Sequence, residues 1–185
     1  MDVKFTEIQS TAERKKVQEL YNKSVPAHEK AYFYPLWWKR KRSNVSFVNI
    51  YDKDKWVGFV FYSLYKDLVY VWFFATHDTT GSKNYNSAMY SEIKRLYPDH
   101  RITVSIEAEN ENGENGEQSI KEKRFCEENG FRETGYFVKR KTDSFELMLI
   151  GESFHIEELY SVNKEVYPLM GRFIVSDMKK QIQKK

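Results

Sequence analysis

The sequence is poor in cysteine and has no long apolar run. Its 185 residues include a single cysteine, Cys126, which excludes an internal disulfide and a thiolate zinc cage and is typical of a reducing cytosol. No apolar stretch approaches the roughly 18 residues that a membrane-spanning helix needs. Charged Asp2, Lys4 and Glu7 interrupt any apolar, signal-like start. We therefore expect a cytoplasmic globular protein with no membrane segment.

An excess of one charge and a metal-ligand pattern are also missing. Thirty Lys and Arg against 27 Asp and Glu leave a net charge of +3, too balanced to indicate a nucleic-acid binder by field strength. The glutamate-rich run 110–116 is not a calcium loop, because placing the required glycine at Gly113 puts Ala108 and Ser119 where carboxylates are needed. Neither a metal nor a nucleic-acid partner is predicted. The four histidines show no ligand spacing: His28, His77, His100 and His155.

Small aliphatic residues are scarce, whereas aromatic residues are abundant. Nine Leu and six Ala stand against 13 Phe, 13 Tyr and four Trp. Leu, Ile, Val and Phe still total 46 residues, enough for one domain of ordinary size. Flat, bulky side chains must therefore carry much of the burial. Much of the excess falls in segments 32–38 and 56–74.

Hydrophobic periodicity and turn signals predict one α/β (α+β) domain with a single mixed, mostly antiparallel central sheet flanked by helices. The domain is expected over 1–150, with a basic, helical extension over 151–185 that packs on it or forms a dimer interface. The expected strands are 3–8, 45–51, 56–65, 68–75, 102–106, 131–139 and 145–150. The expected helices are 10–22, 27–40, 84–97 and 119–129, and a helical tail from 155.

Two local motifs point to a family. The apolar strand ending in Phe73-Phe74-Ala75-Thr76 is followed by a polar loop and a helix that opens with Gly81-Ser82-Lys83-Asn84-Tyr85-Asn86-Ser87-Ala88. A strand that enters a helix through a tight loop presents backbone amides and the positive end of the helix dipole to an anion. The second motif is Arg124-Phe125-Cys126-Glu127-Glu128-Asn129-Gly130-Phe131. With the order of elements, these motifs resemble the GNAT family of acetyl-CoA-dependent N-acetyltransferases over Val3 to about Ile150.

The resemblance implies a GNAT-like acyl-CoA N-acyltransferase fold with acetyl-CoA as cofactor. Strand backbone would pair with the pantetheine arm, and the loop and helix start would hold the diphosphate. The chain departs from the family's Arg/Gln-x-x-Gly-x-Gly/Ala pattern, because Gly81 takes the Arg/Gln position and Asn84 and Asn86 replace the glycines. Asparagine tolerates left-handed backbone best after glycine, so the loop can still form. The cofactor-binding residues implied are Phe74, Ala75, Thr76, Gly81, Ser82, Lys83, Asn84, Tyr85, Asn86, Ser87 and Phe125.

The catalytic positions implied by the resemblance differ from the family pattern. Cys126 aligns with the tyrosine that frequently serves as general acid, so it either protonates the departing CoA thiolate or simply fills buried space. The buried strand offers Tyr70 and Trp72 where a catalytic carboxylate often lies. Glu107 and Glu109, at the end of the next strand, are therefore the predicted bases. Tyr136 on the returning strand is an alternative proton donor, and His77 is predicted to be an exposed loop residue.

The acceptor side is predicted to include segment 26–38. By resemblance, Tyr32, Tyr34 and Trp37 would shape the pocket for a small-molecule amine or embrace its cation. Trp37-Trp38 and the four cations after them could alternatively bind nucleic acid, but we favour a helix end with the tryptophan pair packed inward. The expected protein is a monomer or homodimer with an unidentified acceptor. A non-catalytic acyl-CoA-binding or regulatory module is the alternative function.

Overall fold

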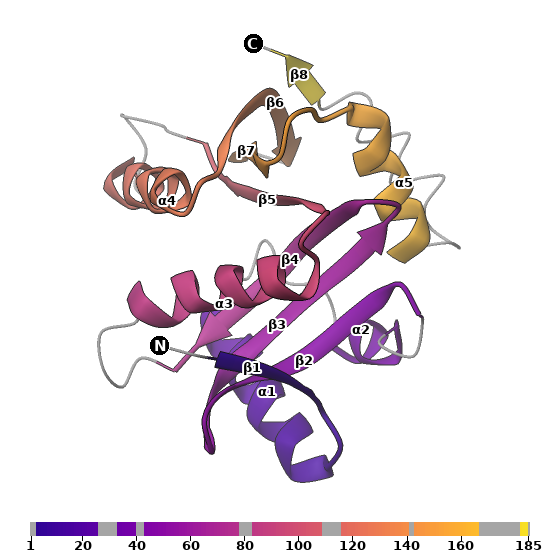
Figure 1. Cartoon of the computed structure of the whole chain (residues 1–185), viewed down its shortest axis with the longest axis vertical. Helices are drawn as coiled ribbons and strands as arrows, with labels where there is room; N and C mark the ends of the chain where they lie inside the picture. Colours follow the sequence, from indigo (N-terminus) through magenta and orange to yellow (C-terminus); the bar gives the residue numbers. More distant parts are fainter. Residues whose placement is uncertain are drawn as a thin grey trace. The chain divides into compact units, whose positions relative to one another are not determined.

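The computed structural model describes residues 3–25, 33–39, 43–77, 83–108, 116–140, 143–166 and 182–184 (Figure 1). The chain divides into two compact units, which are described separately. Unit 1 is Met1–Ser63 and Val71–Pro98, and unit 2 is Leu64–Tyr70 and Asp99–Lys185. The described elements are β1 (Val3–Glu7), α1 (Thr11–Ser24), α2 (Phe33–Lys39), β2 (Val45–Asp52), β3 (Lys55–Tyr65), β4 (Leu68–Thr76), α3 (Lys83–Leu96), β5 (Arg101–Glu107), α4 (Gly116–Glu128), β6 (Arg132–Arg140), β7 (Asp143–Ile150), α5 (Ile156–Val166) and β8 (Ile182–Lys184).

The strands are hydrogen-bonded in the order β1-β2-β3-β4-β5-β7-β6-β8. Short turns connect β2 to β3 and β3 to β4, whereas β4 reaches β5 through α3. Among the described strands, β4 and β5 therefore form the one parallel pair in a mostly antiparallel sheet. The predicted fold class, a mixed and mostly antiparallel sheet flanked by helices, is therefore confirmed.

Helices cover both faces of the sheet in unit 1 (Figure 1). On one face, Tyr21 of α1 lies with its ring centroid 5.8 Å from those of both Phe33 in α2 and Phe73 in β4. On the other face, Tyr90 of α3 contacts the neighbouring strand residue Phe74 at 5.7 Å. Successive residues of a strand point to opposite faces, so α1 and α3 pack on opposite sides of β4. Many of the abundant aromatic residues thus form the core of this unit.

Helix α4 in unit 2 ends as its sequence predicts. Gly130 has a φ of 87°, and its N–H donates to the carbonyl of Glu127 while that of Phe131 donates to the carbonyl of Cys126. These two hydrogen bonds define a Schellman motif, in which the residue after the helix takes a left-handed backbone conformation that glycine adopts readily. The second motif therefore closes a helix and leads the chain into β6.

The expected elements differ from the structure mainly at their ends. The prediction of a helical tail is wrong for residues 182–184, which form β8 and pair antiparallel with β6 from Tyr136 to Val138. The open edge of β6 supplies backbone groups that a strand satisfies and a helix does not. Helix α4 begins at Gly116 rather than Ser119, and the Ser119 hydroxyl donates to the Gly116 carbonyl at 3.0 Å. The remaining helical expectations at 27–32 and 167–181 lie outside the described residues.

Candidate functional site

The end of β4 is tied to the first turn of α3 in unit 1. Thr76 Oγ1 donates to Asn86 Oδ1 at 3.2 Å, across the loop that joins the two elements. Ala75 is buried, and Phe74 contacts Tyr90 of α3. The strand end and the helix start of the predicted diphosphate cradle are therefore held together by side chains on both.

Backbone of β3 approaches the same strand end closely. A Cβ atom built on Gly58 would lie 2.1 Å from the carbonyl oxygen of Ala75, so only glycine fits there. One residue away, the N–H of His77 donates to the Val57 carbonyl at 2.7 Å. Sequence reasoning missed this role, although a glycine inside a strand is a known sign of close backbone approach.

The start of α3 contains the remaining predicted cofactor residues. The Tyr85 hydroxyl donates to Asp52 Oδ2 at 3.1 Å and thereby ties α3 to the end of β2. Burial and the Asp52 carboxylate raise the pKa of Tyr85. Asn86 and Ser87 are half-buried in the first turns of the helix. Gly81 and Ser82 lie outside the described residues, and for Lys83 and Asn84 the structure places only the helical backbone.

Cys126 is an interior residue of α4 in unit 2. Its side chain is 3% exposed, and burial, followed by the charges of Glu122 and Glu127, raises the pKa of the thiol to about 12. An ordinary thiol has a pKa of about 8.5, so proton transfer from Cys126 to a CoA thiolate would be unfavourable. This geometry favours the packing alternative. The neighbouring Phe125 is half-buried, and its carbonyl accepts a 2.8 Å hydrogen bond from Asn129.

The predicted base Glu107 is the last residue of β5 and is half-buried. Beyond it, the N–H of Ala108 donates to the carbonyl of Ser144 at 2.7 Å and holds the strand end against β7. Glu109 lies outside the described residues. Tyr136 is half-buried in β6, where its ring meets the edge of Phe154 at 5.9 Å.

The polar atoms of Tyr70 and Trp72 on β4 have hydrogen-bond partners. The Tyr70 hydroxyl donates to Ser105 Oγ at 3.3 Å in unit 2. The Trp72 indole donates to Ser63 Oγ at 2.8 Å in unit 1. Both side chains therefore have a structural explanation, and neither supplies the carboxylate that the family often uses. His77 is exposed, as predicted.

Two of the three predicted acceptor residues lie in α2. Trp37 is 9% exposed and stacks on Phe33 at 6.2 Å, so it belongs to the aromatic core. Tyr34 is 52% exposed and Trp38 is 72% exposed. The prediction that both tryptophans pack inward is therefore wrong for Trp38, because consecutive helical residues point about 100° apart and only one of the two faces the core. Tyr32 lies outside the described residues.

Within the described segments, no three His, Cys, Asp or Glu side chains are grouped as metal ligands. No described helix is both long and apolar enough to cross a membrane.

The chain was compared with protein families, curated proteins and solved structures. No family model and no curated protein matches it. Among solved structures, a GNAT-family protein from Bacteroides thetaiotaomicron superposes with a TM-score of 0.67 and 21% identity, covering 92% of this chain and 96% of that one. The ribosomal-protein-S18-alanine N-acetyltransferase from Escherichia coli gives 0.58 at 10% identity, covering 83% and 96%. Spermidine N-acetyltransferase from Vibrio cholerae, in complex with CoA and spermine, gives 0.58 at 14% identity, covering 80% and 95%. The chain therefore has the fold of the GNAT N-acetyltransferases.

Proposed function

We propose that this protein is an acetyl-CoA-dependent N-acetyltransferase that moves an acetyl group to a primary amine by direct attack in a ternary complex. The observation that carries the proposal is the superposition, over 80% of the chain or more, on structures that include N-acetyltransferases, one of them holding CoA and spermine. The strand–loop–helix segment from β4 to α3 supports it, since it supplies the backbone amides and helix dipole that a diphosphate needs.

The proposed cofactor contacts come from the strand end and the helix start. Backbone of Phe74, Ala75 and Thr76 pairs with the pantetheine arm, and the first amides of α3 hold the diphosphate. Asn86 accepts from Thr76 through Oδ1, so its Nδ2 amide is the group left to donate to a phosphate oxygen. The asparagine thus replaces part of the close backbone contact that glycine allows in the family pattern.

The proposed reaction has one bond-forming and one bond-breaking event at the thioester carbon. The neutral amine nitrogen attacks, a C–N bond forms, and the C–S bond to CoA breaks. Glu107 accepts the proton that the nitrogen loses, directly or through water. The CoA thiolate takes its proton from water or from Tyr136, because the buried thiol of Cys126 is too weak an acid to supply it.

Cofactor binding is tested first, by thermal shift with acetyl-CoA. Binding to the folded state alone adds RT ln(1 + [L]/Kd) to stability, about 2.7 kcal/mol at one hundred times Kd, so the melting temperature must rise. An unchanged melting temperature at saturating acetyl-CoA would contradict both an acetyltransferase and an acyl-CoA-binding module.

Turnover is then tested by thiol release across a panel of primary amines. Glu107→Gln should lower kcat about a hundredfold, as loss of a general base does, without changing the Kd for acetyl-CoA. Glu128→Gln is the matched control, because this exposed residue of α4 pairs with the exposed Arg124 of the same helix, and its substitution should leave both constants unchanged.

The second candidate function is a non-catalytic acyl-CoA-binding or regulatory module. It is favoured by the burial and raised pKa of Cys126, which leave the family's general-acid position without a competent donor. Acetyl-CoA would then raise the melting temperature, but no amine in the panel would release thiol above the rate without protein. The two measurements therefore separate an enzyme from a binding module.

A further inference from the structure

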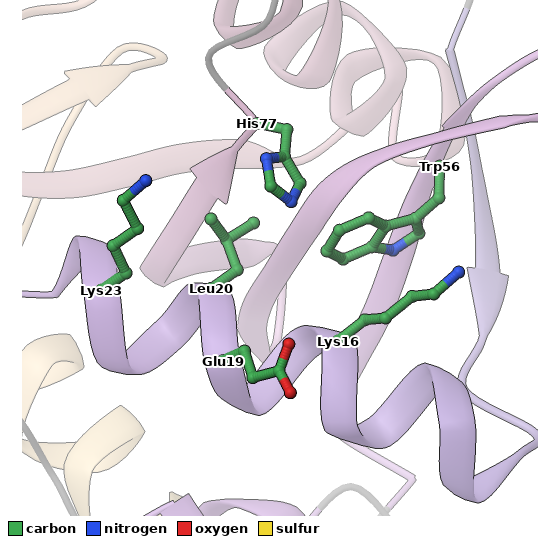
Figure 2. Close-up of a pocket in the computed structure, with 6 residues that line it drawn as sticks. All are labelled: Lys16, Glu19, Leu20, Lys23, Trp56 and His77. Atoms are coloured by element: carbon green, nitrogen blue, oxygen red, sulfur yellow. The ribbon is translucent and has the colours of Figure 1, made fainter.

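Unit 1 contains a cavity of about 530 Å³ between α1 and the nearby ends of β3 and β4 (Figure 2). Its volume falls within the roughly 300–1,000 Å³ of small-molecule sites. Helix α1 contributes four residues at the i, i+3, i+4, i+7 spacing of one helical face. The lining residues are Lys16, Glu19, Leu20, Lys23, Trp56 and His77.

The two aromatic walls of this pocket are fixed by contacts of their own. Trp56 donates from Nε1 to Oδ1 of the fully buried Asn49 at 2.9 Å. The backbone N–H of His77 donates to the Val57 carbonyl at 2.7 Å, and its ring meets the Trp56 indole edge-on at 5.3 Å. The flat surfaces are therefore in place before a ligand arrives, which lowers the cost of ordering them.

The charges of the pocket favour an anion. Lys16, Glu19 and Lys23 are exposed, and none of them makes an ion pair with another residue in the described part of the chain. Two ammonium groups and one carboxylate give the lining a net positive charge, and the His77 ring adds a hydrogen-bond donor. Leu20 and the Trp56 indole supply apolar surface between them.

The lining is also polarised from one side to the other. Figure 2 shows Lys23 on one side of Leu20 and Trp56 with Lys16 on the other, with the His77 ring between Leu20 and Trp56. A ligand that satisfies both sides carries an anionic group at one end and a flat ring at the other. Glu19 only accepts hydrogen bonds, so it suits hydroxyl groups between those ends.

We propose that this pocket binds a nucleoside phosphate, with the base against Trp56 and the edge of His77, the phosphate at Lys23, and the ribose hydroxyls toward Glu19. The pocket lies on the α1 face of β4, opposite the face covered by α3. It is therefore a second site, separate from the acyl-CoA cradle proposed at the start of α3. The inference goes beyond acetyl transfer and does not depend on it.

The test is isothermal titration of the full-length protein with adenosine 5′-monophosphate in the presence of saturating acetyl-CoA. AMP should bind, and adenosine and inorganic phosphate should each bind at least about tenfold more weakly, because each lacks one half of the ligand. Lys23→Ala should raise the AMP Kd about tenfold, the loss expected from one charge-assisted hydrogen bond. Lys15→Ala removes the same charge from α1 outside the pocket and should leave the Kd unchanged.

The ring contact is tested at Trp56. Trp56→Leu should weaken AMP binding about tenfold by removing a stacking surface, and Trp56→Phe, which keeps a ring, should recover part of the loss. Circular dichroism of each variant shows that it is folded.

Three results would overturn the proposal: no heat with AMP, equal losses in the Lys15 and Lys23 variants, or displacement of AMP by acetyl-CoA. Displacement would assign the nucleotide to the cofactor's own site. Because acetyl-CoA binding and thiol release are measured separately, failure here leaves the proposed function standing.

Discussion

The guanidinium of Arg101 and the carboxylate of Glu158 are joined by two hydrogen bonds, Nη2 to Oε1 at 2.6 Å and Nη1 to Oε2 at 2.9 Å. The same guanidinium donates to both carboxylate oxygens of Asp67 at 2.8 Å and to the Ser153 carbonyl at 2.7 Å. Arg101 begins β5, Asp67 lies in the turn between β3 and β4, and Glu158 belongs to α5. One planar side chain therefore connects three segments of unit 2.

Replacing Arg101 by alanine should lower the free energy of unfolding substantially. The side chains of Arg101 and Glu158 are 15% and 14% exposed, so the substitution leaves a mostly buried carboxylate without its cation. We expect a loss of about 2–4 kcal/mol in urea unfolding. Arg124→Ala is the control, because its pair with Glu128 is exposed and should be worth less than about 1 kcal/mol. Equal losses would contradict the assigned role.

The same ion pair predicts acid sensitivity. Burial raises the pKa of Glu158, but hydrogen bonds from Arg101 and from the His155 N–H outweigh it, so the pKa lies below the ordinary 4.5. A lowered folded-state pKa contributes stability above the unfolded pKa and loses it as the pH falls through the folded pKa. Glu158→Gln should therefore be less stable at neutral pH but lose less stability below 4.5. Urea unfolding midpoints of both proteins, measured across this pH range, show how steeply each one loses stability. If the two proteins lost stability in parallel, Glu158 would not be the source of the acid sensitivity.

The buried thiol predicts low reactivity. With a pKa of about 12, Cys126 is ionised in only about one molecule in ten thousand at pH 8, against about a quarter for an ordinary thiol. A thiol-specific disulfide reagent should therefore react more than about a hundredfold faster in urea than with the folded protein. Cys126→Ala should keep kcat within about twofold, since a packing residue takes no part in proton transfer. Rapid labelling of the folded protein, or a large loss of kcat, would restore a catalytic role.

The adjacent tryptophans of α2 form a matched pair for substitution. Trp37→Ala should cost about 3–5 kcal/mol, because it empties a position between Phe33 and Phe47 in the aromatic core. Trp38→Ala should change stability by no more than about 0.5 kcal/mol, since this side chain is mostly exposed. Similar unfolding energies for the two variants would contradict the assignment.

Local signals in the sequence predicted much of the fold. Alternation and helical spacing identify elements without knowledge of their partners, and Asn129-Gly130 predicts a helix end because glycine alone readily takes that backbone. The side of a helix that faces the core depends on its phase, so the difference between Trp37 and Trp38 was not predicted. Residues 182–184 become a strand only because β6 offers an edge, which the local sequence does not reveal.

The sequence predicted which segments contribute to the candidate site, but not the contacts between their side chains. The motif around Thr76 and Asn86 was found from its order along the chain, but their hydrogen bond depends on the path of the loop between them. The clamp between Arg101 and Glu158 joins residues 57 positions apart, and no local pattern indicates it. The pocket at Trp56 and His77 combines four residues of one face of α1 with two residues more than thirty positions further along the chain, and no local pattern indicates that they meet.

Gly58→Ala tests whether the geometry of the β4 end matters for the proposed cofactor. The new Cβ would lie 2.1 Å from the Ala75 carbonyl oxygen and 2.9 Å from the Thr76 Cα, so β3 and β4 must move apart. We expect a stability loss of about 2–4 kcal/mol and at least a tenfold rise in the acetyl-CoA Kd, measured by titration calorimetry at a temperature where the variant is folded. Val57→Ala is the control, because it removes buried methyl groups from the neighbouring position and leaves the β4 backbone in place. If both variants lose stability and neither loses acetyl-CoA affinity, the strand end does not hold the cofactor.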